Sequence, residues 1–567
     1  MKETHFEIEK MIEKFYYTRF CRERSEFDSL KEDDFRKRKD QMDLIWEQEE
    51  QNHFYMSEMP SNHEICHRMF YDALNGRKKL YIRIPDIRKI EKSYDDERVY
   101  ERYEEHDERV DNKRLGIEWE EGITICGSLF STDMIDYDLM FFEAMHSENE
   151  EIKKEATEYY KPYIFSFVFV LDSELHNILL DEPRKRSGVG YGKGDEGDSW
   201  FTYECSFSDD ENGIRIPGMV VQSASKIEKI AAGITIKYDE KSKKDDPKKA
   251  YYKEIQKNVV TDDDFSNSLI SLMTEEMTAA DIYRVGNANC IFVETKSGGS
   301  DFFFDLGVDT KKDPKSKGRY LYASSIQRIK RKKPKFVCLS HWDLDHISVF
   351  SDVPDAFFSV KWFAPDCYDA SLEALRLAQK ISANDCLIMA DRREHRSKSS
   401  TGRRVAEIHI QTNTVGLSPV YEIYMGEKTP CDSSYANSEG LFILYSDDLK
   451  SGNNQILMLG DVNYEAYNAA RLSSQKANII DTVVDCIVAP HHGSKHTGYD
   501  VFNQAGPNTP KGSYGIFCCD NNGLDRPNKQ HKDCLNKKVN SILNTETDSG
   551  TNDRIRIKII GGKIIKQ

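Results

Sequence analysis

The sequence has no apolar stretch long enough to cross a membrane. Its longest apolar window, residues 164–171, is interrupted by Ser166 and is far shorter than the roughly 20 residues that a membrane-spanning helix needs. The first residues, Met1 to His5, lead into charged sequence rather than into the apolar centre of a signal peptide. We therefore expect a soluble, cytoplasmic protein without membrane contact.

A disulfide framework and an excess of positive charge are also missing. The thirteen cysteines are odd in number and include no Cys-x-x-Cys pair, which favours reduced thiols in the cytosol over disulfides. With 97 acidic residues against 80 Lys and Arg residues, the formal net charge is −17, so the chain as a whole does not attract nucleic acid. Any such binding requires a local basic surface.

A chain of 567 residues is too long for one hydrophobic core, and the sequence predicts three regions. Residues 1–115 are dense in charge, with apolar residues at helical spacing, and predict a helical region. Residues 116–275 carry short β-favouring runs, among them 200–207 and 219–221, and predict a β-containing domain without a recognisable site. The residues with readable chemistry lie in the third region, 279–567.

The first chemical signal follows an apolar strand predicted at residues 336–339. The sequence Ser-His-Trp-Asp-Leu-Asp-His then places four metal-ligating side chains within six residues, namely His341, Asp343, Asp345 and His346. A loop that leaves a strand can turn such side chains inward, so that imidazole and carboxylate groups converge on one or two divalent ions. Taken alone, the cluster fits a solvated polar loop equally well.

Two further predicted strands end in the same types of residue. Residues 455–459 are apolar and lead into a Gly-Asp pair with Asp461, and residues 483–489 lead into Pro-His-His-Gly-Ser with His491 and His492. Ligands at neighbouring strand ends are how a sheet builds a shared site. We therefore predict that the three segments form one metal centre.

In this order along the chain, the motifs resemble those of the metallo-β-lactamase fold superfamily, an αββα sandwich with a dinuclear metal site. The His-x-Asp-x-Asp-His element at 341–346 is similar to the hydrolase domain of ComEC-type DNA-uptake proteins. The Asp-Leu-Gly turn at 305–307 resembles the first motif, whose Asp supports the ligand loop, and Asn437 lies where other branches carry a His ligand. The resemblance implies an α/β fold, with this sandwich at residues 279–567 after the helical segment and the β-containing domain.

The resemblance also implies two divalent ions, Zn²⁺ or Mn²⁺, because three carboxylates make the ligand set harder than a His-rich zinc site. Their expected ligands are His341 and Asp343 for the first ion, Asp345 and His346 with one of the adjacent histidines for the second, and Asp461 between the two. His492 is favoured as that ligand because the superfamily's His commonly precedes Gly. His491 would then support a ligand or face the substrate, and Asn437 would add an oxygen.

The chemistry implied is hydrolysis by a hydroxide shared between the two ions. The expected catalytic residues are Asp343, Asp345, His491 and Lys495. Ser494 and Lys495 would bind a phosphate oxygen or only cap the following turn. The basic run at residues 328–335 would either guide a polyanionic backbone toward the metals or form a solvated face.

Two positions depart from the family pattern. Ile-Ser-Val at residues 347–349 replaces Ile-Gly-Gly after the ligand loop, and Arg526 stands where a late motif of the family has His. If that His protonates a leaving group in relatives, then His496, His531 or Arg526 would take its role here.

Three functional hypotheses follow. The first is a metal-dependent phosphodiesterase, a nuclease acting on DNA or RNA; the alternative substrates for the same centre are small cyclic or lipid phosphodiesters and acyl bonds such as thioesters or lactams. The second is a metal-free binding or sensor module, which six retained ligand residues disfavour. The third concerns residues 1–275, which would bind a protein partner or restrain the hydrolase, as would suit bacterial antiviral defence.

Overall fold

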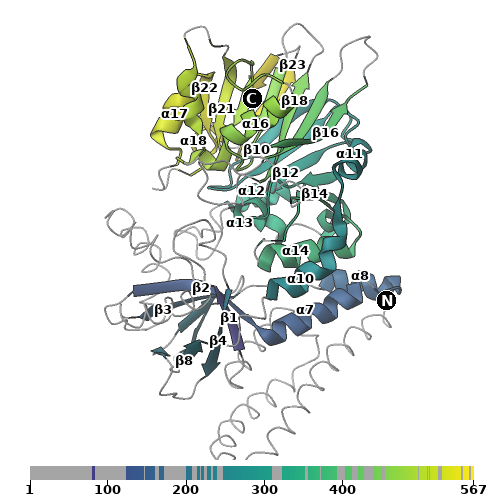
Figure 1. Cartoon of the computed structure of the whole chain (residues 1–567), viewed down its shortest axis with the longest axis vertical. Coiled ribbons are helices and arrows are strands. Elements are labelled where there is room, and N and C mark those ends of the chain that lie inside the picture. Colours follow the sequence, from purple (N-terminus) through teal and green to yellow (C-terminus); the bar gives the residue numbers. More distant parts are fainter. Residues whose placement is uncertain are drawn as a thin grey trace, which may run out of the picture. The chain divides into compact units, whose positions relative to one another are not determined.

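A computed structural model of the chain (Figure 1) describes residues 79–83, 123–145, 147–159, 165–171, 200–206, 214–216, 219–222, 227–230, 234–238, 247–308, 322–351, 355–368, 370, 372–392, 402–411, 419–426, 439–447, 454–474, 476–495, 497–506, 509, 511–520, 526–550, 553–560 and 563–567. These residues form two compact units, one up to residue 238 and the other from residue 247 onward. Within the described parts of the chain, no helix is both long and apolar enough to span a membrane.

The first unit contains one eight-stranded antiparallel sheet, in the order β5-β8-β4-β1-β2-β3-β6-β7. Its elements are β1 (Lys79–Arg83), β2 (Ile123–Ser131), α7 (Thr132–Met145), α8 (Glu150–Tyr159), β3 (Phe165–Leu171), β4 (Trp200–Ser206), β5 (Ile214–Ile216), β6 (Met219–Gln222), β7 (Ile227–Ile230) and β8 (Ile234–Tyr238). The β-favouring runs therefore form strands as predicted. Within the region predicted as helical, residues 79–83 are instead a strand, because β2 and β4 pair with it on both sides. The rest of residues 1–115 lies outside the described residues.

The second unit contains two sheets. The nine-stranded sheet has the order β24-β23-β10-β11-β12-β13-β14-β15-β9. Its strands are β9 (Val259–Val260), β10 (Met277–Tyr283), β11 (Cys290–Thr295), β12 (Phe302–Leu306), β13 (Phe336–Cys338), β14 (Lys361–Pro365), β15 (Leu387–Ala390), β23 (Arg554–Ile560) and β24 (Lys563–Lys566). The seven-stranded sheet runs in sequence order through β16 (Arg403–His409), β17 (Val420–Met425), β18 (Leu441–Asp447), β19 (Asn454–Met458), β20 (Cys486–Val488), β21 (Gly512–Phe517) and β22 (Val539–Asn544).

The two sheets pack face to face with helices outside them. Phe304 and Phe336 of the first sheet share one buried cluster with Ile443 and Met458 of the second. On the outer face of the second sheet, Leu444 packs with buried residues of α16 (Tyr464–Ser473) and α17 (Lys529–Leu535). On the first sheet, α14 (Leu372–Ala383) contacts both β15 and α10 (Pro247–Ile255). This layering confirms the α/β sandwich predicted for the C-terminal region.

Strand direction brings the chemical motifs to one edge of the sandwich. β12, β13 and β14 are parallel neighbours in the first sheet, and β19, β20 and β21 are parallel neighbours in the second. The residues that follow β12, β13, β19 and β20 therefore leave the sheets at their carboxyl ends. The Leu441 N–H donates to the Ser340 carbonyl (2.7 Å), which joins the loop after β13 to the second sheet.

A buried carboxylate holds the C-terminal strand β23 on the first sheet. Asp281 on β10 is fully buried and contacts Arg556 (2.7 Å), Arg554 (3.0 Å) and Lys332 (3.0 Å). Lys332 also bonds Glu294, and burial of Glu294 is outweighed by its bonds to Arg556 and Lys332, which lower its pKa to about 2. The network joins β10, β11, β23 and the segment before β13.

We expect Asp281→Ala to lower the free energy of unfolding by about 3–5 kcal/mol, because it leaves several partly buried cations without their shared carboxylate. Urea unfolding followed by circular dichroism measures the change. Lys296→Ala is the control, since Lys296 pairs with Glu276 at 3.6 Å and its side chain is 70% exposed, so its loss costs less than about 1 kcal/mol. Equal losses in the two variants would contradict the assignment.

Candidate metal centre

The loop after β13 is held by the carboxylate of Asp305, the residue before the end of β12. Asp305 is fully buried and accepts hydrogen bonds from the Ser340 N–H (2.6 Å), the Ser340 hydroxyl (2.8 Å) and His346 Nδ1 (2.8 Å). Because His346 donates its Nδ1 proton to a carboxylate, its Nε2 carries the lone pair. That second nitrogen is the one available to bind a metal.

Asp461 and His492 come from the ends of two strands in the second sheet. Asp461 follows β19 and is almost fully buried, and His492 follows β20 in the short 3₁₀ turn η6 (Pro490–Gly493). The ring of His492 donates from Nδ1 to the carbonyl oxygen of Cys518 (3.0 Å), so its Nε2 also carries a lone pair. Cys518 lies just after β21, and nothing in the sequence marked it as part of the site.

The structure brings together all six residues that the sequence predicted as ligands. Asp345, His346, Asp461 and His492 each place one ligand atom within 4.8 Å of all the others, which is an arrangement that could hold a metal ion. His492 Nε2 lies 3.1 Å from Asp345, and His346 Nε2 lies 3.2 Å from Asp461. The remaining two residues are beside them, with His341 Nε2 3.4 Å from Asp343.

Three buried polar atoms show that the site suits metal ions. His341 Nε2, His346 Nε2 and Asp461 Oδ1 are buried and make no hydrogen bond of normal geometry within the described part of the chain, although His346 Nε2 and Asp461 Oδ1 lie 3.2 Å apart. Such an atom costs about 1–3 kcal/mol when its hydrogen bond is not replaced. All three belong to imidazole or carboxylate groups that turn toward one another, and a divalent cation would satisfy them together.

Electrostatics keeps the carboxylates of the cluster ionised. Burial opposes ionisation, yet His491 and His346 hold the pKa of Asp461 well below its usual range, and His346 and His492 do the same for Asp345. Burial alone would lower the pKa of His346, but Asp461 and Asp305 raise it well above normal. The same acidic surroundings would favour a divalent cation, which would take the place of the proton on His346 Nε2.

The turn that carries both histidines has an unusual backbone. His491 (φ 48°), His492 (φ 53°) and Gly493 (φ 83°) are three successive residues in the left-handed region, which costs about 1–2 kcal/mol for each non-glycine residue. Hydrogen bonds hold the turn on two sides: the His491 N–H donates to Gly460 O (3.1 Å), and the Asn528 N–H donates to Gly493 O (2.8 Å).

His531 supports the same turn from behind. It is fully buried, donates from Nδ1 to Ser494 O (3.2 Å) and accepts the Tyr464 hydroxyl at Nε2 (3.1 Å). Burial lowers the pKa of His531 to about 4, so the ring is neutral at neutral pH. The alternative that His531 protonates a leaving group is therefore wrong, because the ring is enclosed and both its nitrogens are occupied.

Other residues predicted at the site lie at its margin or outside the residues that the structure describes. His491 is half-buried, and burial lowers its pKa to about 4, with Asp461 opposing and the charge of Arg526 adding to the effect. Arg526 therefore lies close enough to act on the centre. His496 and Asn437 fall outside the described residues.

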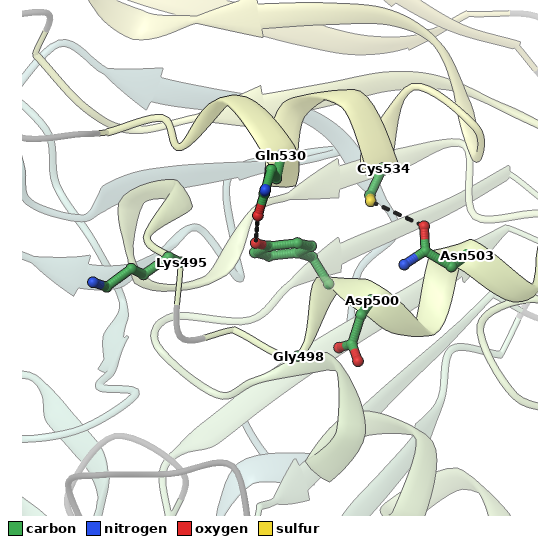
Figure 2. Close-up of a pocket in the computed structure, with 7 residues that line it drawn as sticks. Lys495, Gly498, Asp500, Asn503, Gln530 and Cys534 are labelled. Carbon is green, nitrogen blue, oxygen red and sulfur yellow. Dashed lines mark hydrogen bonds between the residues drawn. The ribbon is translucent and has the colours of Figure 1, made fainter.

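Lys495 does not join the ligand cluster. Its side chain is exposed and lines a neighbouring cavity of about 520 Å³ between η7 (Tyr499–Gln504) and α17. Figure 2 shows this cavity, where the Tyr499 hydroxyl donates to Gln530 (2.9 Å). A phosphate-binding role for Lys495 stays a prediction.

The basic run at residues 328–335 lies away from the ligands. It precedes β13, whereas His341 follows the carboxyl end of that strand. Arg328 pairs with Asp553 (3.5 Å), and Lys332 belongs to the Asp281 network. The idea that this run leads a polyanion to the metals therefore has no support, and a structural role accounts for part of its charge.

Ser348, which departs from the family's Ile-Gly-Gly pattern, fastens the ligand loop to β12. Its hydroxyl accepts the Val308 N–H (2.7 Å) and donates to the Val308 carbonyl (2.5 Å). It directly follows α13 (Leu344–Ile347), the short helix that contains Asp345 and His346. The departure therefore adds a contact at the ligand loop.

Comparisons with known proteins assign no family. No protein-family model matches the chain, and no curated protein matches it either. Similar solved structures include CmlA, a diiron β-hydroxylase from Streptomyces venezuelae (10% identity, TM-score 0.25, 52% of this chain and 54% of CmlA), a diphosphatase from the PhnP family (10%, 0.23, 47% and 94%) and yeast PDE1 (12%, 0.20, 42% and 75%). The chain thus spans about half the length of CmlA. At such low TM-scores these likenesses carry no functional conclusion, which rests on the site itself.

We expect Asp305→Asn to weaken metal binding by about 10–100-fold, because an amide keeps only one oxygen and cannot accept both from the Ser340 N–H and from His346 Nδ1, which bond different oxygens of Asp305. Competition with a chromophoric chelator measures the dissociation constants. Asp553→Asn is the matched control. Like Asp305, Asp553 has a positive φ (52° against 61°), but its carboxylate pairs with Arg328 and, among the described residues, contacts no candidate ligand. Unchanged affinity in Asp305→Asn would show that Asp305 does not orient the ligand.

Gly307→Ala is expected to disrupt the same loop sterically. A β-carbon at Gly307 would lie 1.6 Å from the Asp345 carbonyl oxygen, so the peptide that carries a ligand must move. Metal affinity should fall more than about tenfold, as for the loss of a supporting contact. Gly506→Ala is the control, because a β-carbon there meets no atom within 4 Å. Full metal binding by Gly307→Ala would contradict this packing.

Proposed function

We propose that residues 279–567 form a metal-dependent phosphodiesterase with two divalent ions, Zn²⁺ or Mn²⁺, and that nucleic acid is its substrate. The observation that carries the proposal is the cluster of Asp345, His346, Asp461 and His492, whose ligand atoms lie within 4.8 Å of one another. A metal-free binding module has no need to gather buried imidazole and carboxylate groups at such short distances, where their desolvation is costly. The donor set therefore favours the enzyme.

In this proposal the residues of the cluster have distinct tasks. The bound ions would supply a nucleophile by lowering the pKa of water, and would stabilise charge on a phosphoryl oxygen. Asp461 lies between the two groups of ligands, and Asp305 keeps the Nε2 of His346 free. Asp343 and Asp345 have side chains 43% and 37% exposed, so the substrate reaches the cluster from their side.

Charge beside the histidine turn favours an anionic substrate over an uncharged acyl compound. Arg526 acts on His491 through its charge, and Lys495 follows the turn directly on an exposed surface. The charge of Arg526 thus reaches the ligand cluster, whereas the Lys495 side chain lines the neighbouring cavity. A phosphodiester can use such cations through its non-bridging oxygens, whereas an uncharged thioester has no group that requires them.

For residues 1–275 we keep the hypothesis of partner binding or restraint of the hydrolase. The eight-stranded sheet of the first unit is the folded element available for that task. The described strands of this unit carry no recognised catalytic motif, in agreement with the sequence analysis of residues 116–275.

The test is metal content by mass spectrometry on untagged full-length protein, together with hydrolysis of bis(p-nitrophenyl) phosphate and of labelled single-stranded and duplex DNA and RNA. We expect about two ions per chain and cleavage with Mn²⁺ or Zn²⁺. Removing a residue that only hydrogen-bonds a metal ligand costs about 10–100-fold in activity. Asp461→Asn should cost more than this, because Asp461 would itself bind both ions. Asp263→Asn, an exposed change in α11 (Asp262–Ile270), should behave as wild type.

Metal without cleavage of any phosphodiester, but with hydrolysis of thioesters or lactams, would overturn the substrate class. Absence of bound metal under all conditions would overturn the enzyme. Cleavage of small phosphodiesters alone would overturn nucleic acid as the substrate, while the proposed reaction, phosphodiester hydrolysis, would stand.

A further inference from the structure

We propose that His491 is a ligand of the first ion, so that the two adjacent histidines each bind a different ion. The inference rests on the proposed two-ion hydrolase and assigns the residue that completes its first metal site. On sequence grounds only one of the two histidines was expected to bind an ion, with His492 favoured and His491 then supporting a ligand or facing the substrate.

The two carboxylate oxygens of Asp461 divide the cluster into two groups. Oδ1 lies 3.2 Å from His346 Nε2 and 3.9 Å from His492 Nε2. Oδ2 lies 4.0 Å from His341 Nε2 and 3.5 Å from His491 Nδ1. Each oxygen therefore faces two imidazole nitrogens, and His491 and His341 lie beside the same oxygen, Oδ2.

Asp343 joins the first group through His341. Its carboxylate lies 3.4 Å from His341 Nε2, so the first group comprises His341, Asp343, Asp461 Oδ2 and His491. Asp345, His346, Asp461 Oδ1 and His492 form the second group. Each group offers two imidazoles and two carboxylates, so a single Asp461 gives both sites the same donor set.

The spacing suits a small divalent ion in both groups. Bonds of about 2.0–2.1 Å to four tetrahedral ligands place the ligand atoms about 3.3 Å apart. The distances in the first group are 3.4, 3.5 and 4.0 Å. Those in the second group are 3.1, 3.2, 3.9 and 3.9 Å. The three known distances of the group with His491 thus fall in the same range, although only the group with His492 brings all four ligand atoms within 4.8 Å of one another.

The left-handed turn explains how two adjacent side chains reach one cluster. In a strand, successive side chains point to opposite faces, so a straight continuation of β20 would bring only one imidazole to the cluster. Positive φ at both His491 and His492 turns the two rings to the same side, with centroids 6.2 Å apart. Strain of this kind persists where the surrounding structure and a function require it.

The test uses the full-length protein and metal ions alone. His491→Asn is the variant, because Asn is too short to reach the site and tolerates positive φ better than most residues. Equilibrium dialysis with Co²⁺ and metal analysis should show two ions in wild type. In His491→Asn one ion should remain at wild-type affinity. The other should bind more weakly by more than about 100-fold, the upper end of the loss expected when only a hydrogen-bond partner of a ligand is removed.

Two further variants identify which ion is lost. His341→Gln should lose the same ion as His491→Asn, and the double variant should still bind one ion. His492→Asn should lose the other ion. The control is His409→Asn, because His409 is 61% exposed on β16 and pairs only with Glu407 among the described residues. Paramagnetic resonance with Mn²⁺ gives an independent measurement, since a coupled pair should become a single-ion signal.

Retention of two ions at wild-type affinity in His491→Asn would overturn the inference and leave the two-ion hydrolase intact. Loss of the same ion in His491→Asn and His492→Asn would also overturn it. If His491→Asn failed to fold, His491→Gly would decide instead, because glycine removes the imidazole and adopts positive φ without strain: two ions at wild-type affinity in that variant would contradict the inference. Fewer than two ions in wild type would contradict the proposed function itself.

Discussion

The carboxylate of Asp305 is the interaction on which the rest of the site depends. It has no contact with solvent, and it binds the backbone and hydroxyl of Ser340 together with the ring of His346. Ser340 in turn accepts a backbone bond from Leu441, so one buried carboxylate links the ends of β12 and β13 to the second sheet. The loop of ligands is thus fixed by the interior of the sandwich rather than by its own sequence.

Close packing of glycine supports this arrangement. Gly307 and Gly460 leave room for the Asp345 carbonyl and for the Ser340 side chain, which would lie 1.6 and 2.4 Å from added β-carbons. Because nothing larger fits, the turn after β12 and the turn before Asp461 can approach the ligand loop directly. The short distances between the carboxylates and the imidazoles of the cluster follow from these contacts.

Much of the fold and the grouping of the candidate ligands could be predicted because they depend on local signals. Apolar runs marked β12, β13, β19 and β20, and the polar residues after them marked the site. The strand at residues 79–83 was missed because pairing on both sides outweighs the propensity of a charged segment. His531 was misjudged because burial and two hydrogen bonds, which no spacing reveals, remove it from the substrate.

The sequence by itself determined the types of ligand, their order and their positions after strands, since these follow from side-chain chemistry and hydrophobic period. Only the tertiary structure decided which oxygen of Asp461 faces which histidine, because that depends on the left-handed turn at His491 and His492 and on the packing that holds it. It also decided that the basic run at residues 328–335 lies at the opposite end of β13 from the ligands. Charge and composition report what a chain carries, whereas the direction of each strand and the packing of its ends decide where those groups meet.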